Sequence, residues 1–245
     1  MFTIFIGHKL QNKRMKTIGL IGGLSWESSA VYYNLINKKV NEILGGFHSA
    51  KCVLVSVDFA EIEKLQKIED WESQNKIMVQ SAKQLENAGA DLIVLCTNTM
   101  HISSDEIIKN TSVPFLHIAK ATAESIKEKR LKKIALLGTK FTMEKDFYKD
   151  ILNDFGIETI IPNEKDRGFV HDIIYKELVQ GILKNNSREI YKRVIKNLEK
   201  RGAEGVILGC TEIPLLIQQK DVDITIFDTT KIHAESAVKM ALKSK

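Results

Sequence analysis

The feature that most constrains the fold of this chain is an internal duplication. The segment KTIGLIGG, from Lys16 to Gly23, returns as KKIALLGT, from Lys132 to Thr139. Both are short apolar runs of β type that close on glycine and lead into a polar loop and an amphipathic helix. Tyr32 and Tyr148 follow at the same distance from the two runs. A repeat on this scale indicates a supersecondary unit that occurs twice.

A second repeated pair supports the same interpretation. QLENAGADLIVLCTNT, from Gln84 to Thr99, resembles NLEKRGAEGVILGCTEI, from Asn197 to Ile213, with one more residue between Gly-Ala and Cys in the second copy. Each segment has the pattern of a helix end, a glycine stop, a buried strand and then Cys-Thr. Gly89 and Gly202 suit the left-handed position that ends a helix. Two pairs in the same order favour duplication over chance.

Strands and helices are predicted to alternate between these repeats. We expect strands at 51–57, 113–118, 157–161 and 224–227, and helices at 74–88, 119–129, 188–200 and 229–243. This alternation predicts an α/β fold of two pseudo-symmetric lobes, each a short, mostly parallel sheet flanked by helices. Lobe 1 is expected to span 15–118 plus 226–245, and lobe 2 to span 119–225, with the active site in the cleft between them.

The first fourteen residues precede Met15 and are interpreted as an N-terminal extension upstream of the biological start. A genuine N-terminal arm is the alternative. The segment lacks an adequate apolar core and a small-residue cleavage site, so a signal peptide is not expected.

Composition narrows the class of partner. The 36 basic and 31 acidic residues give a net charge of +5, but the lysines are scattered and aromatic residues make up only 7%, which does not predict a nucleic-acid site. No apolar run approaches the roughly 18 or more residues that a membrane span needs. Three cysteines without a CxxC pair predict neither a disulfide framework nor a zinc site, and favour the cytoplasm.

Two of the cysteines suggest chemistry. Ligands of parallel α/β sheets bind at the carboxyl ends of the strands, and Cys96 and Cys210 each follow an apolar strand and precede a threonine. If the lobes face each other, both thiols point into one cleft. One thiolate could then remove a proton from a stereocentre while the opposite thiol returns one, with amide donors lowering the thiol pKa toward neutrality. When the Cα proton of an amino acid is removed, its carboxylate gains enediolate character, and fixed N–H and hydroxyl donors would stabilise that charge.

Together with these cysteine motifs, the rest of the sequence resembles the aspartate/glutamate racemase family. The resemblance covers essentially all of Lys16 to Lys245 and is carried by GLIGGLSWESSAVYYNLIN, SVDF, LCTNTMH, LLGT and LGCTEIPLL. It implies two pseudo-symmetric lobes, one catalytic cysteine from each, and neither pyridoxal phosphate nor a metal. It further implies the catalytic pair Cys96 and Cys210 and the substrate-binding residues Gly22, Ser25, Asn98, Thr99, Thr139 and Thr211.

The expected function is a cofactor-independent racemase of a small amino acid, aspartate first and glutamate next, acting as a homodimer. Alternatives are a broad-specificity amino-acid racemase, a hydantoin racemase, a maleate isomerase, or a non-catalytic binding module. A cation near the side-chain carboxylate would favour an acidic substrate. The candidates are Lys165, Arg167 and Lys176, whose other interpretation is ordinary surface charge.

Several other residues have two interpretations. Cys52, early in a strand and without a threonine partner, is expected to be a packed core thiol. His101 and His233 are not expected to bind zinc, and a hydrogen-bonded structural role is expected for them, with tuning of a nearby thiol as the alternative. Ser25 suits a helix N-cap as well as the cleft wall. Glu212 could orient a helix N-terminus or bind the substrate amine, and the sequence does not decide between these roles.

Overall fold

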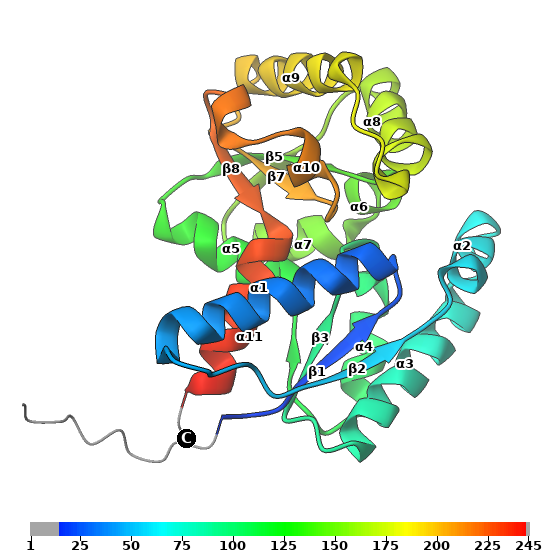
Figure 1. Cartoon of the computed structure of the whole chain (residues 1–245). Coiled ribbons are helices and arrows are strands. Elements are labelled where there is room, and N and C mark those ends of the chain that lie inside the picture. Colours follow the sequence, from blue (N-terminus) through cyan, green and yellow to red (C-terminus); the bar gives the residue numbers. More distant parts are fainter. Residues whose placement is uncertain (1–14, 244–245) are drawn as a thin grey trace, which may run out of the picture.

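The computed structural model describes residues 15–243, so the interpretation of residues 1–14 lies outside the described residues. The first half of the chain forms a parallel four-stranded sheet with the order β2-β1-β3-β4. Its strands are β1 (Ile18–Gly22), β2 (Cys52–Ser56), β3 (Leu92–Leu95) and β4 (Phe115–Leu116). Figure 1 shows this sheet in the lower lobe.

The second half repeats the arrangement. Its parallel sheet has the order β6-β5-β7-β8, which is the same topology. The strands are β5 (Lys133–Gly138), β6 (Glu158–Ile160), β7 (Gly205–Gly209) and β8 (Thr225–Asp228). The predicted α/β fold with two similar sheets is therefore confirmed. β8 continues to Asp228, so the second sheet extends past the boundary expected at residue 225.

Helices cover both faces of each sheet. On the first sheet, α1 (Trp26–Leu44) and α11 (Thr229–Leu242) pack on one face, and α2 (Phe59–Lys67), α3 (Trp71–Asn87) and α4 (Ser104–Asn110) on the other. On the second sheet, α5 (Ile118–Glu128) and α7 (Asp146–Asp154) pack on one face. The opposite face carries α6 (Lys140–Glu144), α8 (Glu164–Lys176), α9 (Asn185–Lys200) and α10 (Ile213–Leu216). Burial of both faces explains why the central strands are continuously apolar.

The last helix of each repeat covers the sheet of the other repeat. α5 follows β4 of the first sheet but packs against Ile134 and Leu136 of β5. α11 follows β8 of the second sheet but packs against Ile18 and Leu20 of β1. The two helices also contact each other, as Figure 1 shows at the junction of the lobes. This reciprocal exchange ties the lobes together at two chain crossings.

Local signals explain where the elements end. Gly89 and Gly202 have φ angles of 81° and 93°, which confirms the left-handed positions predicted after the helices. The strand expected at 113–118 is reduced to Phe115–Leu116. It stops because His117 caps the next helix, its side chain accepting a hydrogen bond from the backbone N–H of Ala119.

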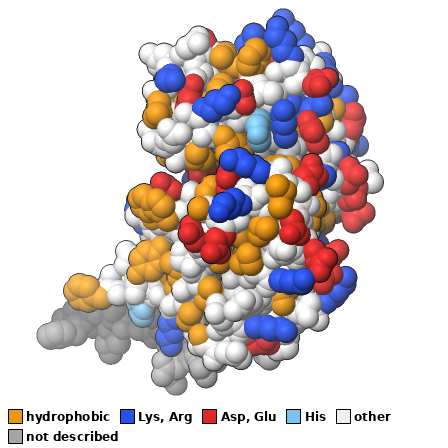
Figure 2. All heavy atoms as spheres, turned by 90° about the vertical axis from the view of Figure 1, so that its right-hand side faces the viewer, with side chains coloured by type: hydrophobic (Ala, Val, Ile, Leu, Met, Phe, Trp, Pro, Cys, Tyr) orange, Lys and Arg blue, Asp and Glu red, His pale blue; other side chains and the backbone are white. Residues whose placement is uncertain are grey.

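The surface is mixed in charge. On the face shown in Figure 2, acidic and basic side chains lie side by side over both lobes. Within residues 15–243, no helix combines the length and the apolar character that crossing a membrane requires.

Candidate active site

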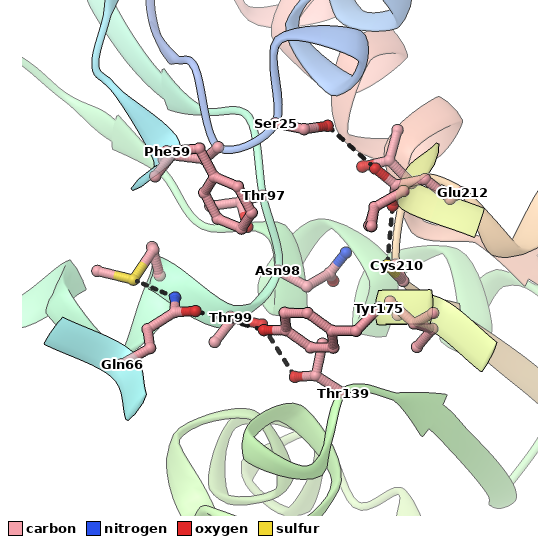
Figure 3. A pocket seen from close by; sticks show the side chains of 16 residues that line it. Ser25, Phe59, Gln66, Thr97, Asn98, Thr99, Thr139, Tyr175, Cys210 and Glu212 are labelled. Carbon is pink, nitrogen blue, oxygen red and sulfur yellow. Dashed lines mark hydrogen bonds between the residues drawn. The ribbon is translucent and has the colours of Figure 1, made fainter. Parts of the chain in front are cut away.

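A pocket of about 40 Å³ lies between the lobes, at the carboxyl ends of the central strands of both sheets. This is where ligands of parallel α/β sheets bind. Its polar lining comes from both repeats (Figure 3): Ser25, Gln66, Thr97, Asn98, Thr99, Thr139, Tyr175, Cys210, Thr211 and Glu212.

The structure brings most of the predicted site residues together. Ser25, Thr139 and Thr211 line this pocket, and so do Asn98, Thr99 and Cys210. The sequence therefore located one thiol and five of its polar neighbours.

Gly22 is not among the lining residues. It ends β1, and a Cβ atom built there would collide with the side chains of Ser29 and Leu54. Close packing of α1 and β2 on this strand end, rather than substrate contact, is the constraint that requires glycine there.

Cys96 also lies outside the pocket, contrary to the expected catalytic pair. Its side chain is 0% exposed and packs in the core between the first sheet and helices α1 and α11. Successive side chains at the end of a strand point to opposite faces. The residue that reaches the pocket is therefore the next one, Thr97.

Strand register shows why the cysteines are not equivalent. In the first sheet, Ile21 of β1 pairs with Leu95. In the second sheet, the corresponding Leu137 of β5 pairs with Leu208. Counting outward from these pairs, Thr97 corresponds to Cys210, and Cys96 corresponds to Gly209.

A sequence signal for this correspondence exists. Aligning the segments that begin at Gly89 and Gly202 without a gap places Thr97 opposite Cys210. The extra residue in the second copy brings the two cysteines into line only when a gap is introduced. That gap shifts the alignment by one residue, which exchanges the two faces of a strand.

Cys210 is held by a buried carboxylate. Its Sγ–H donates a hydrogen bond of 2.9 Å to Glu212 Oε2, and Ser25 Oγ–H donates one of 3.2 Å to Glu212 Oε1. Burial and the negative charge of Glu212 raise the pKa of the thiol well above its usual value, and the backbone N–H groups of Glu212 and Thr211 oppose the rise without cancelling it. The direction is opposite to the expected lowering.

Ser25 has both of the roles considered for it. Its Oγ accepts a hydrogen bond of 3.3 Å from Ser28 N–H, which makes it the N-cap of α1, and the same hydroxyl contacts Glu212. Glu212 in turn precedes α10 at the N-cap position without a side-chain cap hydrogen bond. Its carboxylate is instead engaged by Cys210 and Ser25.

Hydroxyl and amide groups from both lobes surround the thiol. Thr99 Oγ1 and Thr139 Oγ1 lie 3.0 Å apart across the cleft. Asn98 Nδ2 donates to Thr229 Oγ1 at 3.0 Å, while the buried Asn98 Oδ1 has no hydrogen-bond partner among the described residues. Such groups can bind the carboxylate and ammonium of a small zwitterion.

His101 and His233 are hydrogen-bonded in the interior, as predicted. Nδ1–H of His101 donates to the carbonyl of Thr97 at 2.7 Å, and its Nε2 accepts from Ile118 N–H at 3.1 Å. The rings of His233 and His117 lie against it. Both ring nitrogens of His233 are also hydrogen-bonded, to Tyr32 Oη and the Leu116 carbonyl. The hydrogen bonding predicted for His101 and His233 is therefore present.

None of the three candidate cations lines the pocket. Arg167 pairs with Glu144, and Lys176 pairs with Asp172. Lys165 lies over the ring of Phe169. Among the described lining residues the formal charge is that of Glu212 alone.

Fold and site together define a two-lobed, pseudo-symmetric α/β protein with a thiol, a carboxylate and hydroxyl groups at facing strand ends. The model of the family described as Asp/Glu/Hydantoin racemase matches residues 21–237, and the chain belongs to that family.

Solved structures and curated relatives agree with this assignment. The chain is 51% identical to a protein from Yersinia pestis assigned as an Asp/Glu racemase, with a TM-score of 0.89 over 94% of this chain and 100% of the other. It is 39% identical to an aspartate racemase homologue from Pyrococcus horikoshii, with a TM-score of 0.82 and the same coverage. It is also 27% identical to the broad specificity amino-acid racemase RacX of Bacillus subtilis, over 69% of this chain and 73% of that protein.

Proposed function

We propose that the protein is an amino-acid racemase that uses Cys210 as its thiol acid–base group. The observation that carries the proposal is the contact of 2.9 Å between Cys210 Sγ and Glu212 Oε2, in the pocket at the strand ends of a racemase-family fold. A thiol beside a buried carboxylate has a base at hand to take its proton.

The proposed reaction begins with the transfer of the Cys210 thiol proton to Glu212. The transfer removes the carboxylate charge that raises the thiol pKa, and the positive charge of the substrate ammonium, bound in the same pocket, stabilises the thiolate. The thiolate then removes the proton from Cα, and the C–H electron pair moves into the α-carboxylate as an enediolate. Hydroxyl and N–H donors of the pocket stabilise that charge.

Thr97 is proposed to deliver the proton to the opposite face of Cα. It occupies the first-lobe position that corresponds to Cys210, and Figure 3 shows it across the pocket from Cys210 and Glu212. The hydroxyl proton goes to Cα, the oxygen regains a proton from solvent, and Glu212 releases to solvent the proton that it took from Cys210, which restores the starting site. A hydroxyl is a much weaker acid than a thiol, so we expect exchange of the α-proton with solvent to be faster for the enantiomer whose Cα–H faces Cys210.

The substrate is proposed to be a small amino acid. The relatives include an aspartate racemase homologue and a broad specificity amino-acid racemase, which keeps both aspartate and neutral amino acids as candidates. The absence of a cation among the described lining residues favours the broad-specificity alternative.

The test is proton NMR of single amino acids in D2O with purified protein and no added cofactor, followed by chiral chromatography. Loss of the α-proton signal together with appearance of the other enantiomer is the expected result. If aspartate, glutamate and the neutral amino acids all keep their α-protons, the proposal fails, and hydantoins and maleate become the next compounds to test.

We further propose that the enzyme is a cytoplasmic homodimer. Its three cysteines are free, which suits a reducing compartment. Trp26 and Tyr33 are 70% and 57% exposed and lie two turns apart on one face of α1, an apolar surface that suits association. Light scattering coupled to size-exclusion chromatography should give twice the chain mass, and a monomer would contradict the dimer alone.

A further inference from the structure

One wall of the pocket is closed by an amide and a phenol from different lobes. Figure 3 shows Gln66 of α2 and Tyr175 of α8 meeting there. We infer that Gln66 selects the substrate side chain, and that the substrate has a small, uncharged side chain with a hydroxyl or carboxamide group. This inference rests on the proposed function and names its substrate class.

Charge in the pocket disfavours a side-chain carboxylate. A zwitterionic amino acid would place its ammonium near Glu212 and its α-carboxylate among the hydroxyl and N–H donors at the strand ends. A second carboxylate would then lie in the pocket without a Lys or Arg among the described lining residues. A partly buried charge without a partner is unfavourable.

Gln66 offers a better fit to a neutral polar group. Its side chain is buried, with Nε2 donating to the thioether of Met100 at 3.3 Å and Oε1 accepting from Tyr175 Oη at 3.3 Å. Burial raises the pKa of Tyr175, so the phenol stays a donor. A thioether is a weak acceptor, and the amide has two N–H donors. A substrate hydroxyl or carbonyl oxygen would give this buried amide the strong acceptor that Met100 does not provide.

The size of the pocket limits the whole substrate. Its free space of about 40 Å³ must hold the ammonium, the carboxylate and the side chain together. Amino acids with short side chains are therefore favoured.

The first experiment compares isosteric substrates with the wild-type protein. Initial rates of α-proton exchange in D2O would be measured for asparagine against aspartate and for serine against 2-aminobutyrate, with both enantiomers of each. We expect kcat/KM to be at least about tenfold higher for asparagine than for aspartate. We expect it to be about five- to tenfold higher for serine than for 2-aminobutyrate, the ratio that corresponds to one hydrogen bond.

The outcomes separate the two levels of the proposal. A preference for aspartate, or equal rates for serine and 2-aminobutyrate, would overturn the inference and leave the proposed racemase intact. Failure of every amino acid to exchange would overturn the proposed function, and the inference with it.

A substitution then tests Gln66 itself. Gln66→Met has nearly the same shape but no amide, so the ratio of serine to 2-aminobutyrate should fall toward one, mainly through a higher KM for serine. The rate with 2-aminobutyrate measures any general damage to the site. Gln80→Met, at an exposed position of α3, is the matched control and should keep the wild-type ratio. An unchanged ratio in Gln66→Met would rule out the selecting role of Gln66.

Discussion

The two lobes have the same topology but differ at the strand end where chemistry is expected. After β3 the chain reads Cys96-Thr97, and after β7 it reads Gly209-Cys210. The first position faces the core in both lobes and the second faces the pocket. The thiol of lobe 1 is therefore a buried packing group, and the thiol of lobe 2 is a pocket group. Duplicated architecture thus supports an asymmetric site, with a thiol on one side and a hydroxyl on the other.

The difference extends to what supports each position. In lobe 1, the His101 ring is hydrogen-bonded to the Thr97 carbonyl. In lobe 2, the Glu212 carboxylate accepts a hydrogen bond from the Cys210 thiol. Even the equivalent tyrosines differ: Tyr32 contacts His233, whereas Tyr148 donates to Thr122. The two lobes therefore share the order of their strands but differ in the ionisable side chains around the strand ends.

The largest expected effect separates the two thiols. Cys210→Ser should lower α-proton exchange by about 10²–10⁴-fold, because it removes the acid–base group. Cys96→Ala should keep exchange within about threefold and lower the free energy of unfolding by only about 1 kcal/mol. NMR exchange rates and urea unfolding of both variants provide the measurement. Equal loss in both would restore the two-cysteine mechanism and break the comparison.

A smaller loss is expected when the carboxylate beside the thiol is neutralised. Glu212→Gln keeps a similar shape but cannot take the thiol proton, so exchange should fall by about 10²-fold. Without the carboxylate charge the thiol pKa should fall, and iodoacetamide should alkylate Cys210 faster at neutral pH. Peptide mass spectrometry distinguishes Cys210 from Cys52, whose pKa burial raises to about 11. Unchanged turnover would mean that Glu212 is only a structural partner.

A thiol at the pocket position of both lobes should make the two faces of the substrate react at more similar rates. Thr97→Cys gives lobe 1 a pocket-facing thiol, and the slower enantiomer should then exchange about tenfold faster while the faster one changes little. The rates for the two enantiomers, measured separately in D2O, give the result. Symmetric rates already present in the wild-type protein would show that Thr97 does not limit the reaction.

The histidine cluster at the chain crossings is expected to affect stability rather than α-proton exchange. Burial lowers the pKa of His233 to about 4 and of His117 to about 3, and that of His101 well below its usual value. The folded protein keeps these rings neutral, while the unfolded chain takes up protons below about pH 6.5. The free energy of unfolding should therefore fall as pH drops from about 6.5, by up to about 1.4 kcal/mol per pH unit for each ring.

Urea unfolding between pH 7.5 and pH 4.5 measures this slope. His233→Gln should lower this pH slope by about one third of the contribution of the three rings. The variant has one histidine fewer that stays neutral in the folded protein and takes up a proton in the unfolded chain. His48→Gln, at an exposed position, is the matched control. A slope that His233→Gln leaves unchanged would assign the acid sensitivity to other groups.

Much of the fold was predictable because it is repeated in the sequence. Continuous apolar runs that end on glycine predict buried parallel strands, and the polar residues directly after them had to meet at one sheet edge. This placed Ser25, Thr139 and Cys210 in the pocket. Cys96 was misplaced because Cys-Thr occurs in both copies but one position apart, and local composition does not indicate which face of the strand a side chain takes.

What the sequence determined by itself is the α/β class, the duplication and the strand ends that carry the site, because hydrophobic periodicity and glycine stops are local properties. What only the tertiary structure decided is which neighbour of each pair faces the pocket, that Glu212 contacts the thiol, and that Gln66 and Tyr175 meet in one wall of the pocket. Strand register and the packing of one lobe on the other determine these contacts. Both depend on residues far apart in the chain, whose approach no local pattern encodes.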